Sequence, residues 1–118
     1  MFTITKQFQF SASHQLLQLP ATHPCARLHG HNYVVEVELS SAELDGYGFV
    51  RDYNELDDLK QLIAEKFDHR HLNEVLGDDC VTAEQLCRWL FDWCNQHWPE
   101  VSAVRVSETP KTWAEYRP

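Results

Sequence analysis

Apolar and polar side chains alternate along the first residues of the chain. Threonine and glutamine occupy odd positions between the apolar residues, which are Phe2, Ile4, Phe8 and Phe10. A period of two places successive side chains on opposite faces of a strand. A second strand is predicted over residues 31–40, where the apolar residues Tyr33, Val35, Val37 and Leu39 alternate with other side chains. Each strand is therefore expected to bury one face.

The pattern then changes to helical spacing. Over residues 53–67 the apolar positions recur every three or four residues, at Leu56, Leu59, Ile63 and Phe67. Asp52, with Glu55 three residues later, is typical of an N-terminal capping box in which Asp takes the capping role. The segment therefore predicts an amphipathic helix over 53–67.

A second capping box begins at Thr82 and ends at Gln85. The helix that follows is expected to end at about residue 97, because Pro99 cannot continue a helix. Val104 and Val106 suggest a third long strand, and residues 113–116 a fourth.

The predicted order is strand, strand, helix, helix, strand, strand. This order favours an α+β fold in which a four-stranded antiparallel sheet carries two helices on one face. With 118 residues, the chain is expected to form a single domain, 1–118. The second sheet face must be covered or its edges paired, so we expect a homo-oligomer.

Charge and hydropathy exclude some classes of partner. The formal net charge of -8 argues against nucleic acid as a partner. The N-terminus lacks the apolar core of a secretory signal, and no apolar run reaches the roughly 18 residues of a membrane span. We therefore expect a cytoplasmic protein that does not bind membranes. Residues 1–35 contain no acidic residue, however, and most acids lie within 36–79. The whole-chain charge is a poor guide to the charge around a site.

Seven histidines are many for this length, and three of them share a predicted face. His29 and His31 flank Gly30, and residues two apart on a strand point to the same side. His14 keeps the phase of Phe10 and would meet them on an antiparallel neighbour. Three imidazoles leave one tetrahedral position open, as in catalytic zinc sites. The alternative is three histidines that each bond to the backbone.

The cysteines divide into two groups. Cys25 lies four residues before His29, where Arg27 and a nearby metal would favour its thiolate. It would then serve as a base or nucleophile; otherwise it is a fourth zinc ligand or an inert thiol. The remaining three contain no C-x-x-C pair and are interpreted as reduced core residues: Cys80, Cys87 and Cys94.

Two acidic positions also carry possible chemistry. Asp68 lies beside His69 and could orient its imidazole, directly or across a subunit boundary, although adjacent residues of these types are usually only solvated. Glu108 shares the phase of Val106 and should point inward near a strand end. A buried carboxylate needs donors, which a guanine-like ring, local backbone N–H groups or a lysine such as Lys111 would supply.

Four segments together resemble the 6-pyruvoyl-tetrahydropterin synthase family over essentially the whole chain. They are Phe10-Ser11-Ala12-Ser13-His14, Cys25-Ala26-Arg27-Leu28-His29-Gly30-His31, Asp68-His69-Arg70-His71-Leu72-Asn73 and Glu108-Thr109. The short gap between the cysteine and the His-Gly-His segment resembles the 6-carboxytetrahydropterin synthase branch of the queuosine pathway. The resemblance implies the tunnelling fold (T-fold), in which three subunits close a barrel and two barrels form a hexamer with active sites between subunits.

The resemblance also implies residue roles. His14, His29 and His31 match the ligands of one Zn²⁺ per subunit. Cys25 matches the catalytic thiol, and Asp68 with His69 the acid/base pair supplied by a neighbouring subunit. Pterin-binding positions are matched by Glu108, which anchors the ring, and by Thr109 and Thr82. Relatives often have Pro where this chain has Val81.

The implied reaction converts 7,8-dihydroneopterin triphosphate into 6-carboxy-5,6,7,8-tetrahydropterin, acetaldehyde and triphosphate. Two alternatives remain: a pyruvoyl-forming enzyme that keeps the carbon chain intact, and a zinc-binding T-fold protein without catalysis. Charge alone suggests Lys6, Arg27 and His23 as contacts of the triphosphate. No role is assigned to His71 or His97.

Overall fold

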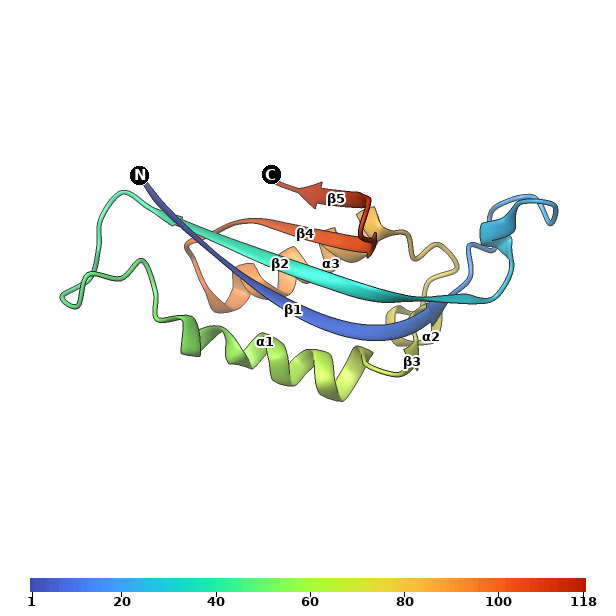
Figure 1. The fold of residues 1–118 in the computed structure, drawn as a ribbon, viewed down its shortest axis with the longest axis horizontal. Helices are drawn as coiled ribbons and strands as arrows, with labels where there is room; N and C mark the ends of the chain where they lie inside the picture. The colour runs from blue at the N-terminus through green and yellow to red at the C-terminus, as the bar shows by residue number, and fades with distance from the viewer.

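The computed structural model describes all residues, 1–118, and its longest feature is a pair of antiparallel strands. Strand β1 (Phe2–His14) and strand β2 (His29–Ser41) pair along their whole length (Figure 1). Both strands are longer than their apolar alternation predicts. His14, expected just beyond the first strand, is the last residue of β1 and lies opposite His29.

Two further antiparallel strands complete the predicted sheet. Strand β4 (Val101–Thr109) pairs with β2, and β5 (Thr112–Tyr116) pairs with β4. The register between β4 and β5 shifts between Val106 and Thr109, which is the part of β4 that carries Glu108. A bulge of this kind changes the direction in which a side chain points.

The sheet has five strands rather than four. The additional strand, β3 (Arg70–His71), pairs in parallel with β1, so that the strand order is β3-β1-β2-β4-β5. A short helix, α2 (Leu72–Leu76), follows it directly. Two residues carry no measurable alternation, so the sequence pattern could not reveal β3.

The first predicted helix is present as one helical run of three geometries. These are η2 (Tyr53–Leu56), α1 (Asp57–Leu62) and η3 (Ile63–Phe67), the last a π-helical turn. The Asp52 side chain caps the run by accepting from the Asn54 amide. Glu55 does not bond back to the cap, because its carboxylate pairs with Arg51.

The second predicted helix, α3 (Ala83–His97), has Thr82 as its N-cap, but the Gln85 side chain does not bond back to Thr82 as in a complete capping box. Thr82 Oγ1 accepts from the Gln85 amide, at 3.1 Å. Trp98 follows the helix before Pro99. None of the helices is both long and apolar enough to cross a membrane.

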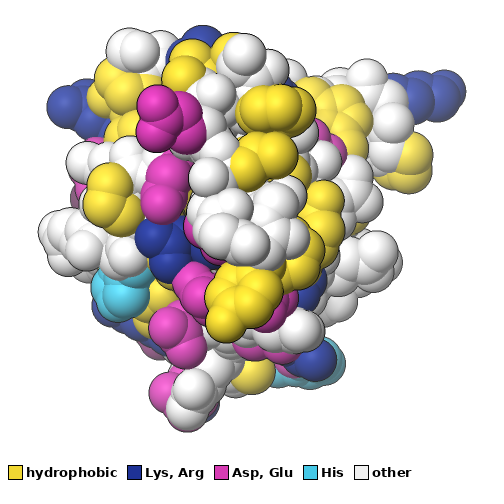
Figure 2. All heavy atoms as spheres, turned by 90° about the vertical axis from the view of Figure 1, so that its left-hand side faces the viewer, with side chains coloured by type: hydrophobic (Ala, Val, Ile, Leu, Met, Phe, Trp, Pro, Cys, Tyr) yellow, Lys and Arg dark blue, Asp and Glu magenta, His cyan; other side chains and the backbone are white.

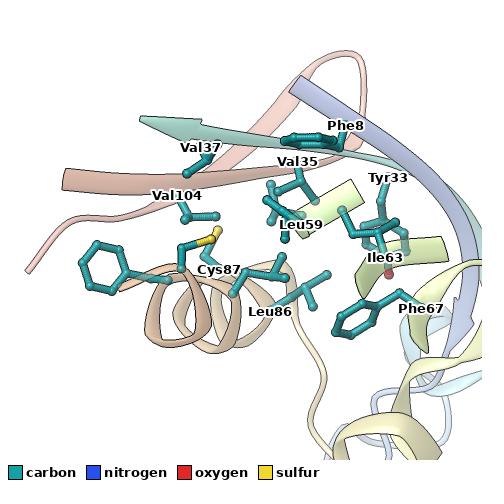
Figure 3. Close-up of a cluster of buried hydrophobic side chains, with 14 of the residues drawn as sticks. Phe8, Tyr33, Val35, Val37, Leu59, Ile63, Phe67, Leu86, Cys87 and Val104 are labelled. Atoms are coloured by element: carbon teal, nitrogen blue, oxygen red, sulfur yellow. The ribbon is translucent and has the colours of Figure 1, made fainter. Parts of the chain in front are cut away.

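The helices cover one face of the sheet, and the core lies between these two layers (Figure 1). Tyr33 stacks on Phe10 with ring centroids 5.0 Å apart, and Phe67 lies 5.8 Å from Phe10. Figure 3 shows apolar side chains of the sheet, of the first helical run and of α3 meeting in this region. The fully buried Cys87 and Cys94 belong to the core, as predicted, and burial raises the pKa of each thiol to about 12. Cys80 is only half-buried, so its assignment to the core was wrong.

The other face of the sheet carries a network of charges. Arg105 contacts Glu36, Glu38 and Glu115, at distances of 2.9–3.0 Å. Hydrogen bonding from Arg117 is the main reason that the pKa of Glu38 is lowered to about 2. Association through this face of the sheet would therefore have to accommodate ion pairs. Charged and apolar side chains are also interspersed at the end of the molecule that bears the loop between β2 and η2 (Figure 2).

Replacing Phe67 with alanine should destabilise the fold by about 3–5 kcal/mol. Phe67 is completely buried and packs on Phe10 and Trp89, so truncation leaves a cavity between sheet and helices. Urea unfolding would measure the loss, with Phe2→Ala at the half-exposed strand end as the matched control. A loss below about 1 kcal/mol for Phe67→Ala would contradict this description of the core.

Candidate metal centre and active site

Three histidines meet at one end of the long strand pair. His14 lies opposite His29 across β1 and β2, and His31 lies two residues further along β2. Their ring centroids are 4.4–5.1 Å apart, and one ligand atom from each side chain lies within 4.8 Å of the other two. These three residues could hold a metal ion, as their shared phase predicts.

The backbone fixes which imidazole nitrogen is free on two of these rings. His14 Nδ1 lies 2.7 Å from the Val81 carbonyl oxygen, and His29 Nδ1 lies 2.6 Å from that of Arg27. Because a carbonyl only accepts, both Nδ1 atoms donate, and each Nε2 keeps its lone pair. Such backbone bonds orient metal-ligating histidines.

The buried His14 ring provides the strongest sign of a ligand. Its side chain is 1% exposed, and its Nε2 has no hydrogen-bond partner. An unpaired buried nitrogen is costly unless something binds it. A zinc ion accepts the lone pair of a neutral imidazole, so the donor set fits this metal.

Burial also favours the neutral form of two of these imidazoles, His14 and His31. It is the main cause that lowers the pKa of His14 and of His31. The negative charge of Glu108 opposes this effect at both rings, but burial dominates. Neutral histidine is the form that binds a metal.

Glu108 lies at the open side of the three histidines. Its Oε2 is 3.3 Å from His14 Nε2 and 3.2 Å from His31 Nε2, and its side chain is 26% exposed. The His14 contact lacks hydrogen-bond geometry, so this nitrogen remains unpaired despite the short distance. Lys111, a possible donor to Glu108 by its place in the sequence, forms no ion pair with it. The carboxylate instead faces the histidines and a cleft.

A cleft of about 490 Å³ runs past Glu108. Its wall includes His31, Tyr33, Thr109 and Trp113. The Tyr33 hydroxyl is buried without a hydrogen-bond partner, and burial raises the pKa of this phenol. Sequence reasoning treated Tyr33 only as a core residue; its hydroxyl could not be recognised as unpaired without the fold. Thr109 borders the cleft, whereas the Thr82 hydroxyl is used to cap α3.

Cys25 lies near this site in sequence but outside the histidine cluster. It belongs to a short 3₁₀ turn, η1 (Pro24–Ala26), and its amide donates to His23 Nδ1 at 3.0 Å. The half-buried thiol is not among the residues whose ligand atoms converge. This arrangement disfavours Cys25 as a fourth ligand.

Asp68 and His69 form a pair at the edge of the sheet where β3 joins β1, and His69 lines one cleft with His31. Asp68 Oδ2 lies 3.0 Å from His69 Nδ1, and its Oδ1 accepts from the Ser11 amide at 3.0 Å. The bond from Ser11 is the main cause that lowers the pKa of Asp68. The pair has no hydrogen bond or ion pair with the three histidines of its own chain.

The backbone holds His69 in an unusual conformation. Its φ is 59°, in the left-handed region that few residues other than glycine adopt, and its amide donates to the Ser11 carbonyl at 2.6 Å. The side chain is 82% exposed. The imidazole is therefore oriented by Asp68 and presented to the outside of the subunit.

Known proteins are similar to this chain over almost its whole length. Residues 3–118 match the family model of 6-pyruvoyl tetrahydropterin synthase. The chain is 36% identical to a putative 6-carboxy-5,6,7,8-tetrahydropterin synthase of Archaeoglobus fulgidus over 92% of this chain and 89% of that protein. It is 34% identical to the 6-carboxy-5,6,7,8-tetrahydropterin synthase of Synechocystis sp., over 98% and 93% of the two chains.

A solved structure extends the similarity to the fold. The 6-pyruvoyl tetrahydropterin synthase of Caenorhabditis elegans superposes with a TM-score of 0.86 at 28% identity, over 99% of this chain and 95% of that one. The expected T-fold is thus confirmed, with the additional short strand β3. The chain belongs to the 6-pyruvoyl tetrahydropterin synthase family.

Proposed function

We propose that this protein is a zinc-dependent 6-carboxy-5,6,7,8-tetrahydropterin synthase of queuosine biosynthesis. The observation that carries the proposal is the set of three converging histidines, one with an unpaired buried Nε2, beside the Glu108 carboxylate. Two relatives that cover almost the whole chain are named for this activity. The substrate is 7,8-dihydroneopterin triphosphate.

His14, His29 and His31 would hold one Zn²⁺ per subunit. When bound, zinc supplies Lewis acidity that makes side-chain hydroxyls of the substrate more acidic. The protein's contribution is to favour neutral His14 and His31 by burial, and to orient His14 and His29 through the carbonyls of Val81 and Arg27.

Glu108 would anchor the pterin ring. A pterin presents a ring N–H and an amino group on one edge, and a carboxylate accepts from both. Glu108 lies on the wall of the cleft and next to the histidines, so one ligand could reach both. Thr109 would contribute a further contact, and Thr82 would act near the ring through its position at the start of α3.

Two groups would move protons. The Cys25 thiolate would remove a proton from the substrate side chain, and His69, oriented by Asp68, would be its acid/base partner. Elimination of triphosphate, addition of one water molecule and cleavage of a carbon–carbon bond then yield 6-carboxytetrahydropterin and acetaldehyde, with the water supplying the second carboxylate oxygen. The exposure of His69 supports supply of this pair to a neighbouring subunit, within a hexamer built from two trimers.

A pyruvoyl-forming enzyme of the same family is the second candidate. The similarity to the Caenorhabditis elegans protein, which is named a 6-pyruvoyl tetrahydropterin synthase, favours it. That reaction keeps the carbon chain intact, so released acetaldehyde distinguishes the two activities. A non-catalytic zinc protein would instead have Cys25 as a fourth ligand.

Removing the Glu108 carboxylate should weaken pterin binding by about 10- to 100-fold, because a charged partner of two ring donors is lost. Isothermal titration of the zinc-loaded Glu108→Ala protein with the reaction product would measure this change. Glu43→Ala, an exposed acid after β2, is the control. Equal affinity in the wild-type and Glu108→Ala proteins would remove the anchoring role.

A further inference from the structure

Strand β3 has only two residues and pairs with the end of β1, next to His14. It pairs with β1 at Ala12 and Ser13, and the chain then turns into α2 with Leu72 completely buried. Gln15 follows the last residue of β1, and β3 has already ended opposite it. The backbone amide and carbonyl of Gln15 therefore have no partner in a neighbouring strand. Unpaired backbone groups in a half-buried position need another partner.

The side chain of Asn73 supplies both missing partners. Asn73 Oδ1 accepts from the Gln15 amide at 2.9 Å, and Asn73 Nδ2 donates to the Gln15 carbonyl at 2.7 Å. We propose that Asn73 is a positioning residue that holds His14 and the Cys25 loop in place through Gln15. The relevance to turnover rests on the proposed function, whereas the positioning itself does not.

The path from Gln15 to Cys25 is short. Gln15 Nε2 donates to the Ala26 carbonyl at 3.3 Å, and the Leu16 amide donates to the Cys25 carbonyl at 3.0 Å. These two bonds join the backbone of Cys25 and Ala26 to the end of β1. Displacement of Gln15 would therefore release the loop that carries the thiol.

The path to the histidine cluster is direct, because His14 precedes Gln15. Residues 16–17, which follow Gln15, are also bonded to the chain just before α3. The Leu17 amide donates to the Asp79 carbonyl at 3.2 Å, and Leu16 forms a β-bridge with Cys80. His14 Nδ1 bonds to Val81 in the same stretch. The end of β1 thus lies between two loops, and Asn73 fixes its position.

Only an amide side chain suits this position. The carboxylate of an aspartate could accept from the Gln15 amide, but it has no proton to donate to the carbonyl and would face it with a negative charge. Asn73→Asp therefore keeps the shape of the side chain and loses one of its two bonds. Asn95→Asp is a matched control, since Asn95 is exposed on α3 and forms no side-chain hydrogen bond.

The test is the rate at which iodoacetamide alkylates Cys25, followed by mass spectrometry. Trypsin releases residues 7–27 as one peptide in which Cys25 is the sole cysteine, so its reaction is resolved from the others. Asn73→Asp should raise this rate about tenfold as the loop opens more often. Zinc affinity, measured by chelator competition, should fall about tenfold. Turnover should fall about 10- to 100-fold, with KM changed less than about threefold.

A second variant tests the path through Gln15. Gln15→Leu removes the bond to Ala26 and leaves both backbone bonds with Asn73. It should raise the Cys25 alkylation rate while zinc affinity stays within about twofold of wild type. The double variant should alkylate about as fast as Asn73→Asp alone, because both changes act on one connection.

Several outcomes would overturn the proposal. It is wrong if Asn73→Asp alkylates no faster than Asn95→Asp, or if the two changes at Asn73 and Gln15 are additive. If Asn73→Asp does not fold, an unchanged alkylation rate in Gln15→Leu overturns it equally. A wild-type protein that does not convert the pterin substrate would contradict the proposed function alone, because the alkylation and zinc measurements would still decide the role of Asn73.

Discussion

The His29→Ala protein is expected to bind zinc at least about 100-fold more weakly than wild type and to lose turnover. Removing an orienting neighbour of a metal ligand already costs 10- to 100-fold, so loss of a ligand should cost more. His29 suits the test better than His14, whose ring is almost completely buried and contributes to the packed end of the sheet. Two imidazoles would remain, which is fewer than any common zinc site uses.

The readout is the number of zinc ions per subunit after dialysis against a weak chelator. Inductively coupled plasma mass spectrometry would measure it. His97→Ala is the control, because His97 stacks on Trp93 at the far end of α3 and lies outside the cluster. Added zinc should also raise the free energy of unfolding of wild type, by about 4 kcal/mol at 1,000 times the dissociation constant. A His29→Ala protein that retains zinc with wild-type affinity would show that the three histidines are not the metal centre.

The Cys25→Ala protein should keep its zinc and lose turnover by about 10²- to 10⁴-fold, the usual contribution of a positioned base. The expectation follows from the position of Cys25, in a turn tied to the end of β1 but outside the group of converging ligand atoms. Cys80→Ala is the matched control, since Cys80 is also half-buried and near the same segment.

Turnover and zinc content of the Cys25→Ala protein together distinguish a base from a ligand. Wild-type turnover in Cys25→Ala would exclude the thiol as the base. Loss of zinc together with activity would instead make Cys25 a fourth ligand, and the non-catalytic interpretation of the site would gain support.

The sequence predicted the main architecture because its signals are local. Alternation marks β1 and β2, and residues such as Leu59 and Ile63 mark the first helical run at helical spacing. Thr82 marks the start of α3 through a bond to the amide three residues later. By contrast, β3 exists only because Arg70 and His71 pair with Ala12 and Ser13. A segment of two residues is too short to show an alternation that would predict this pairing.

The same distinction applies to the site. The phase of His14, His29 and His31 predicted a shared face, and antiparallel pairing brought them together. The inward direction of Glu108 also followed from its phase, whereas its approach to two histidine nitrogens joins separate strands and could not be predicted from spacing. The roles of Asn73 and of the unpaired Tyr33 hydroxyl arise from contacts between distant segments, which spacing cannot show.

The most direct test of the proposed function is incubation of the zinc-loaded protein with 7,8-dihydroneopterin triphosphate. Mass spectrometry would identify the pterin product, and a coupled assay would measure acetaldehyde. We predict 6-carboxy-5,6,7,8-tetrahydropterin and acetaldehyde in equal amounts. A pyruvoyl product without acetaldehyde, or unchanged substrate, would contradict it.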